Sequence, residues 1–292
     1  MQPQSDLWAV AALHTSRRTG ETRLISPLAT LLERLEDRAA CDADVIPWGA
    51  PVPAFGDLAS SRVATLGLNP SNREFVDDQG LELSEDLRRF HTLRSLGIES
   101  WSQAEAKHLS LILDACRNYF MGNPYDRWFR RLDVVVAATG ASFYSAEQPA
   151  CHLDVIPYAT AQKWMALTRR QRARLLDLAG DTLGLLLRHA PVRVLILNGQ
   201  SVVTLFEKAT GVRLERQVMP QWSLPRVSAA PVAGIAYAGV TNSISGHCLA
   251  QDILVLGFNH NLQSSFGVTA VAVAAIRAWV AEQAGTFTEC VA

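Results

Sequence analysis

Four short apolar segments, each followed at once by polar or turn-forming residues, constrain the fold of this chain more than any other feature. The segments are 62–68 (RVATLGL), 151–156 (CHLDVI), 192–197 (VRVLIL) and 253–258 (ILVLGF). Apolar, β-branched runs that end in residues such as Asn-Pro or Asn-Gly indicate buried strands. Helical patterns separate the runs, and this alternation indicates a parallel sheet covered on both faces. We therefore expect an α/β fold: a three-layer α/β/α sandwich around a four-stranded parallel sheet.

The rest of the chain predicts mainly helices. Ser26-Pro27 and the leucines that follow have the N-cap, first-turn proline and apolar stripe of a helix that extends to about Ala40. Further helices are expected over 84–95, 102–120, 161–189 with a break near Gly180, 201–208 and 265–283, and weaker strands over 134–138 and 235–240. We expect a single domain over residues 1–292, with an N-terminal helix and a proline-rich connection, residues 1–60, packed on it.

Composition narrows the class of protein. Hydrophobic residues make up 49% of the chain and charged residues 19%, which is typical of a globular protein. The net charge of −1 excludes a strongly basic nucleic-acid coat but permits a local basic patch. The five cysteines are scattered without a CxxC pair, so we expect free thiols, a cytoplasmic location, no metal site and no cofactor. Neither a signal peptide nor a membrane span is predicted.

The predicted strands place polar residues where a parallel sheet binds its ligands, at the carboxyl ends of the strands. Asn69, Asp154, Asn198 and the Asn259-His260-Asn261 segment all lie at such ends. The sequence lacks a GxSxG nucleophile elbow, a glycine-rich phosphate loop and a zinc-protease or zinc-deaminase motif. An uncharged asparagine and histidine suit a reaction that orients a water and stabilises a developing anion. Asn69 and His260 are therefore the candidate catalytic residues.

Two of these segments resemble motifs of a known family. Gly67-Leu68-Asn69-Pro70-Ser71 resembles the first motif, GINPG, of the mismatch-specific uracil and thymine branch of the uracil-DNA glycosylase superfamily. Asn259-His260-Asn261-Leu262-Gln263-Ser264-Ser265 resembles the second motif, HPSPLS or NPSGLS, although asparagine and not proline follows His260. By strand order, Asp154 takes the place of the family's base-reading residue. The resemblance covers residues 62 to 280, and the family fold is also an α/β/α sandwich around four parallel strands.

The resemblance implies a monofunctional DNA glycosylase, which flips a pyrimidine out of duplex DNA and hydrolyses its bond to deoxyribose to leave an abasic site. Asn69 would orient the attacking water, and His260 would donate a hydrogen bond to the pyrimidine O2. The implied base pocket comprises Gly67, Leu68, Ser71, Phe75, Asp154 and Asn259. The implied DNA contacts are a wedge, Leu262 or Gln263, and the phosphate-binding residues Lys163, Ser264 and Ser265.

The predicted base follows from Asp154 and Ser71. Uracil-specific members of the family have asparagine in place of Asp154, whereas a carboxylate accepts from the N4 amine of cytosine. Members that reject thymine have tyrosine in place of Ser71, so a serine implies room beside C5. Together they predict a hydroxymethylated or glucosylated cytosine of phage DNA, and antiviral defence. Repair of uracil or mismatched thymine, hydrolysis of free nucleosides and non-catalytic DNA binding are the alternatives.

Overall fold

A computed structural model describes residues 20, 22–226, 230–263 and 267–291 of the chain. One mixed sheet holds six strands in the order β2-β1-β3-β6-β5-β4. The strands are β1 (Val63–Gly67), β2 (Ala150–Asp154), β3 (Val194–Asn198), β4 (Glu215–Leu224), β5 (Val232–Ile244) and β6 (His247–Phe258). Strands β2, β1, β3 and β6 run parallel to their neighbours, so the α/β fold and the four predicted strands are confirmed.

The prediction of a sheet with only four strands is wrong, because β4 and β5 extend it with antiparallel pairing. The predicted strand 235–240 belongs to β5, which lies between β6 and β4. The edge strand β4 escaped prediction because most of its side chains are exposed and polar. Only Met219 and Trp222 of β4 are buried, and they are too few to form an apolar pattern.

The described helices are the following: residues 22–35, α2 (Arg38–Asp42), α3 (Leu93–Leu96), α4 (Ala106–Arg117), α5 (Asp126–Val136), α6 (Arg169–Ala179), α7 (Thr182–Leu187), α8 (Gln200–Thr210) and α9 (Ala270–Val291). They confirm the N-terminal helix and the break near Gly180. The predicted strand 134–138 is wrong, because these residues end α5, where Leu132, Val135 and Val136 are buried at helical spacing. The predicted helix 84–95 is reduced to short turns and α3.

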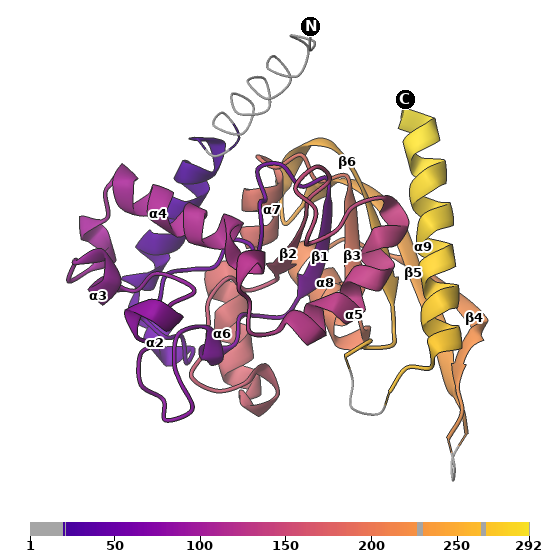
Figure 1. Cartoon of the computed structure of the whole chain (residues 1–292), viewed down its shortest axis with the longest axis horizontal. Coiled ribbons are helices and arrows are strands. Elements are labelled where there is room, and N and C mark those ends of the chain that lie inside the picture. Colours follow the sequence, from indigo (N-terminus) through magenta and orange to yellow (C-terminus); the bar gives the residue numbers. More distant parts are fainter. Residues whose placement is uncertain (1–19, 21, 227–229, 264–266, 292) are drawn as a thin grey trace, which may run out of the picture.

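Two hydrophobic clusters lie on opposite faces of the sheet. Figure 1 shows the helices that pack against the sheet. Leu195 and Leu197 of β3 belong to the cluster that includes α6, α7 and α8, whereas Val194 and Ile196 belong to the cluster that includes α5 and α9. This division follows from the alternation of side chains along a strand. Among the described residues, helices therefore cover both faces of the sheet, and the strand ends are the expected place for a binding site. Within the described residues, no helix combines the length and apolar character needed to cross a membrane.

A segment that precedes β1 covers the outer edge of β2. Phe55 and His152 exchange two backbone hydrogen bonds of 2.8 Å, and Val52 N donates to Pro157 O at 2.7 Å. The parallel register then aligns the other strands, because Gly67 pairs with Asp154, Leu66 with Leu197, and Asn198 with Phe258. As a result, the loops after β1, β2, β3 and β6 leave the sheet at the same edge.

Candidate functional site

Gly67, the last residue of β1, leaves space for two buried polar side chains of β2. A Cβ atom on Gly67 would collide with Asp154 Oδ1 and lie 2.8 Å from His152 Nε2. Asp154 is 6% exposed, and its Oδ1 lies 3.7 Å from His152 Nε2. His152 Nδ1 in turn shares a 2.7 Å hydrogen bond with Thr65 Oγ1. Glycine at the first motif is therefore required by the close approach of Asp154 and His152.

Asn69 is held in one orientation by acceptors around its amide nitrogen. Its Nδ2 donates to Pro70 O at 3.1 Å and to Thr160 Oγ1 at 3.0 Å, and Tyr158 O lies at 3.4 Å. Because a backbone carbonyl can only accept, these contacts fix which end of the amide is nitrogen. The half-buried side chain therefore presents Oδ1, which makes no hydrogen bond to the described residues, as an acceptor. Leu68, just before it, is half-buried against the core.

Ser71 and Phe75 take structural positions around this loop. Ser71 Oγ caps the 3₁₀ turn η1 (Asn72–Glu74) by accepting from Arg73 N at 3.2 Å. Ser71 also shares a hydrogen bond with the side chain of Tyr125. Burial raises the pKa of Tyr125, and the hydrogen bond to Ser71 opposes this shift. The small side chain of Ser71 thus has a tyrosine beside it rather than open space. Phe75 is buried and packs edge-on against Trp48, with 6.2 Å between ring centroids.

Glu74 is a buried acid that sequence analysis missed. It is 2% exposed, and its Oε1 accepts from the Tyr119 hydroxyl at 2.8 Å. Its Oε2 is buried without a hydrogen-bond partner among the described residues. Burial raises the pKa of Glu74 to about 7, the Tyr119 hydrogen bond and Arg89 oppose the shift, and the charge of Asp154 adds to it. A glutamate in the loop segment NREF is expected on the surface, so the sequence carries no signal of its burial.

The residues after β6 are tied to the β4–β5 hairpin. Asn259 Oδ1 accepts from Ile235 N and its Nδ2 donates to Ala233 O, both at 2.8 Å, so this side chain extends the backbone pairing. His260 Nε2 donates to Trp222 O at 2.6 Å, since a carbonyl has no hydrogen to give. Burial lowers the pKa of His260. The one N–H group of a neutral His260 therefore donates to Trp222 O, and its Nδ1 can only accept a hydrogen bond. The family motif, by contrast, implies that this histidine donates a hydrogen bond to the base.

The loop after β6 is held by Asn198 at the end of β3. Asn198 Oδ1 accepts from Leu262 N at 3.1 Å, which orients its amide, and its Nδ2 donates to Gln263 Oε1. The Nε2 of Gln263 is buried and has no partner in the described part of the chain. Leu262 is only 5% exposed and packs in the cluster of α5 and α9, so it is not an exposed wedge in this structure. Ser264 and Ser265 lie outside the described residues.

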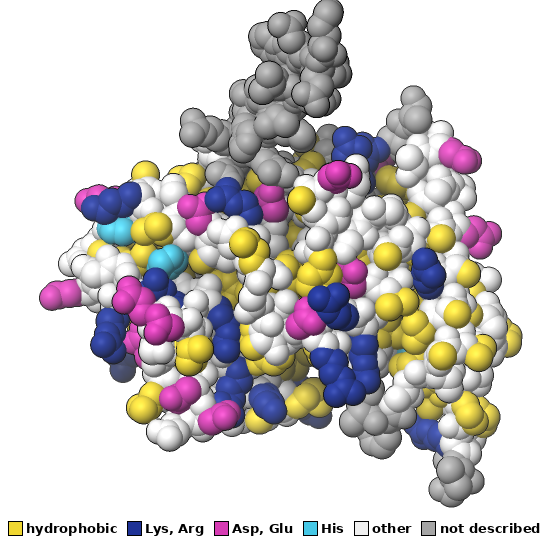
Figure 2. Space-filling view, in the orientation of Figure 1, with side chains coloured by type: hydrophobic (Ala, Val, Ile, Leu, Met, Phe, Trp, Pro, Cys, Tyr) yellow, Lys and Arg dark blue, Asp and Glu magenta, His cyan; other side chains and the backbone are white. Residues whose placement is uncertain are grey.

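Basic side chains accompany this edge of the sheet. Lys163 is exposed in the loop after β2, and this loop is joined to the Asn69 loop where Asn72 Nδ2 donates to Ala161 O at 3.0 Å. Arg169 and Arg170, at the start of α6, are exposed as well. Figure 2 shows several Lys and Arg side chains gathered on the lower part of the molecule, where the parallel strands end in Figure 1. This arrangement provides the local positive charge that phosphate contacts need.

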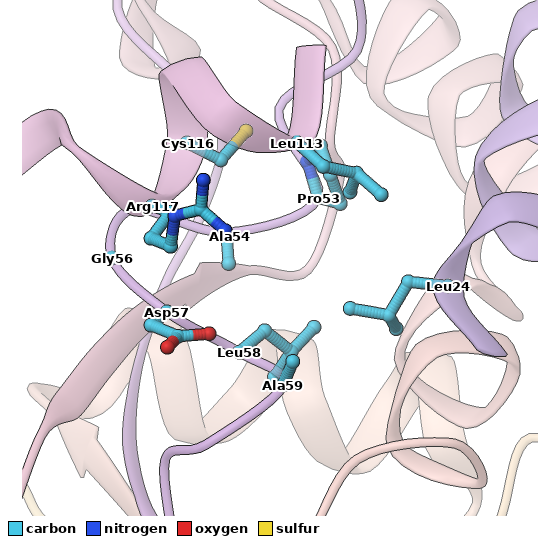
Figure 3. Close-up of a pocket in the computed structure, with 10 residues that line it drawn as sticks. All are labelled: Leu24, Pro53, Ala54, Gly56, Asp57, Leu58, Ala59, Leu113, Cys116 and Arg117. Carbon is cyan, nitrogen blue, oxygen red and sulfur yellow. The ribbon is translucent and has the colours of Figure 1, made fainter. Parts of the chain in front are cut away.

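The cavity in Figure 3 lies away from these residues. It has a volume of about 20 Å³ and lies between residues 53–59, which precede β1, the helix α4 and Leu24. That volume holds about one water molecule and not a nucleobase. We take the loops at the strand ends, which carry Asn69, Glu74, Asp154 and Gln263, as the candidate site.

Glu74 makes the stability of the protein depend on pH. Its pKa is about 7 in the folded chain against an ordinary value of 4.5, so the unfolded chain loses this proton first as the pH rises. The protonated Glu74 therefore adds about 3 kcal/mol to the free energy of unfolding below pH 4.5, and this contribution is lost as the pH rises to about 7. We expect Glu74→Gln to gain stability over the wild type by up to this amount at pH 8, and far less at pH 4.5.

Urea unfolding at both pH values measures the difference. Glu85→Gln, which changes an exposed glutamate in the short turn η2 (Glu85–Leu87), is the matched control and should leave the pH dependence unchanged. Equal effects of Glu74→Gln at the two pH values would show that folding does not raise the pKa of Glu74.

No family model matches the chain, and neither a curated protein nor a solved structure does. The interpretation of this site therefore depends on its own geometry and on the two motifs.

Proposed function

We propose that the protein is a DNA glycosylase that hydrolyses the N-glycosidic bond of a flipped pyrimidine. The observation that carries this proposal is the fixed amide of Asn69, whose free Oδ1 lies on the loop that leaves β1 beside buried Asp154. Such an oxygen accepts a hydrogen bond from a water and orients it. Departure of the base makes the sugar oxocarbenium-like, so the attacking water needs orientation more than a strong base. An oriented water and the absence of a strong base suit an enzyme that lacks a nucleophilic side chain.

The departing base carries negative charge on O2, which requires a hydrogen-bond donor. We assign this role to Gln263 and not to His260. Asn198 fixes Oε1 of Gln263 as an acceptor, so Nε2 is the end of the amide that has no hydrogen-bond partner among the described residues. His260, by contrast, uses its N–H to hold the carbonyl of Trp222. Its contribution is then to position the β4–β5 hairpin against the loop after β6.

The proposed substrate is a cytosine with a large C5 group, hydroxymethylated or glucosylated, and the proposed role is defence against phage DNA. Asp154 supports a cytosine, because its carboxylate accepts from an exocyclic amine and repels the O4 of uracil. Ordinary cytosine must be spared in the host's own DNA, so recognition has to include C5. The hydroxyls of Ser71 and Tyr125 supply polar contacts suited to a hydroxymethyl or sugar group. Lys163, Ser264 and Ser265 remain the proposed phosphate contacts.

The role of Asn69 predicts a selective loss of chemistry. Asn69→Ala should lower the single-turnover rate of base excision by about 100-fold or more, because a water-orienting hydrogen bond is lost, while folding and duplex binding persist. Asn72→Ala removes an exposed amide of the same loop and is the matched control, with a rate within a few-fold of the wild type. A near-normal rate for Asn69→Ala would refute the proposed mechanism.

The assignment of the O2 donor predicts different results for two neighbours. Gln263→Ala should slow excision by roughly 100-fold, as for the loss of one oxyanion donor, and it also costs stability because Asn198 Nδ2 loses its acceptor. His260→Ala should lower the free energy of unfolding by about 1–3 kcal/mol, since it breaks a buried hydrogen bond, without a comparable loss of rate. Single-turnover kinetics and urea unfolding of both variants test this. The reverse pattern would return the donor role to His260.

The substrate is tested with duplexes that contain cytosine, hydroxymethylcytosine, glucosylated hydroxymethylcytosine, uracil or a thymine mismatch. Abasic sites are revealed by alkaline cleavage after incubation with the wild type. We expect cleavage at the modified cytosines and none at cytosine. Cleavage confined to uracil or mismatched thymine would identify a repair glycosylase, and cleavage of free nucleosides alone would exclude a DNA substrate.

A further inference from the structure

Glu74 Oε2, which has no hydrogen-bond partner among the described residues, is the feature of the site that the proposed function leaves unused. A buried polar atom without a hydrogen bond destabilises a folded protein, and such atoms are rare. Glu74 ends the turn η1, which starts only three residues after Asn69. The charge of Asp154 acts on Glu74, so both carboxyl groups belong to the same part of the site. Its Oε2 is therefore a contact that a bound molecule can complete.

We propose that Glu74 is a second base-reading residue, which donates a hydrogen bond from Oε2 to N3 of the bound cytosine while Asp154 accepts from N4. The Tyr119 hydroxyl already donates to Oε1, so a proton on Glu74 resides on Oε2. A protonated Glu74 and the carboxyl oxygens of Asp154 then offer the same base a donor and an acceptor. Cytosine presents the complementary pair, an acceptor at N3 next to a donor at N4, and uracil presents the reverse order.

The surroundings of Glu74 favour the protonated form up to neutral pH. Burial and the charge of Asp154 raise its pKa to about 7, and the Tyr119 hydrogen bond and the charge of Arg89 oppose this shift. Tyr125 also faces this group, and its own ionisation is disfavoured by burial and by Glu74. The aromatic rings of Phe90 and Tyr119, stacked 5.4 Å apart, keep the surroundings apolar. The donor is therefore present below about pH 7 and is lost as the pH rises above it.

This contact also helps the chemistry of the proposed enzyme, on which the inference rests. As the bond between N1 and C1′ breaks, its electron pair moves into the base, and a hydrogen bond at N3 stabilises that charge. A water oxygen bonds to C1′, and the proton of that water goes to solvent. Cytosine is a poorer leaving group than uracil, so a donor at N3 has more effect with a cytosine.

The experiment is the pH dependence of single-turnover excision from a duplex with hydroxymethylcytosine. We expect the wild-type rate to fall about tenfold per pH unit above pH 7, as Glu74 loses its proton. Glu74→Gln keeps a donor that does not titrate, so its rate at pH 6 should stay within about fivefold of the wild type and its alkaline fall should vanish. Glu74→Ala should be slower at pH 6 by about tenfold or more. A wild-type profile in Glu74→Gln, or a wild-type rate in Glu74→Ala, would overturn the proposal.

A second measurement does not depend on excision. Carboxyl ¹³C NMR of wild type and Glu74→Gln identifies the Glu74 resonance, and free 5-hydroxymethylcytosine serves as the probe. We expect the base to shift this resonance in the wild type and in Asn69→Ala alike. No shift would overturn the contact even if excision were observed, whereas a shift without excision from any duplex would support the contact and refute the glycosylase. Glu85→Gln, with its change on the surface, should leave both readouts as in the wild type.

Discussion

The parallel pairing of β1 with β2 is the constraint on which the site depends. Its register places Gly67 opposite Asp154, and only the missing side chain of the glycine lets the carboxylate and His152 lie against the backbone of β1. The pairing continues beyond the strands, since Val155 N donates to Gly67 O and Ile156 N donates to Leu68 O. Asn69 therefore enters its loop at a position set by the neighbouring strand. A shift of one residue would exchange the two faces of the strand and bury different side chains.

Beyond the ends of the strands, hydrogen bonds from side-chain amides hold the loops in place. Asn69 is fixed by Pro70 O on its own loop and by Thr160 Oγ1 and Tyr158 O on the loop after β2. Asn198 fixes the loop after β6, and Asn259 extends the pairing of β5. An amide carries both a donor and an acceptor without charge, so it can be buried at moderate cost when both ends are satisfied. Two of the buried polar atoms that have no hydrogen-bond partner among the described residues, Glu74 Oε2 and Gln263 Nε2, lie at this edge of the sheet and stand out against this pattern. They are the reason to regard this edge as a binding site.

The sequence predicted the parts of the fold that are encoded locally. The four apolar segments became the parallel strands because each is buried on both faces, a property that is visible in the composition of a short run. The three valines at 134–136 led to the wrong prediction of a strand. The surrounding residues place them on a helix whose buried positions recur every three to four residues. Strand β4 has no apolar face of its own, and its partner β5 supplies the hydrogen bonds that define it. Asn69 and Asp154 were predicted as site residues from the same local pattern. The environments of Glu74 and His260 could not be predicted, since Tyr119 and Trp222 lie 45 and 38 residues away.

The segment before β1 has a consequence for the order in which the protein forms during synthesis. Its contacts with β2 and the following loop, such as Phe55 with His152 and Ile46 with Ala159, join residues about 100 positions apart. At roughly 5–20 residues per second, a ribosome needs about 5–20 s to make the second partner after the first. During that time the apolar residues Val52 and Phe55, which are buried in the finished protein, have no strand to pair with. The nascent chain thus passes through a stage in which these apolar side chains are exposed to solvent. We expect a chaperone to bind this segment at that stage and to prevent aggregation.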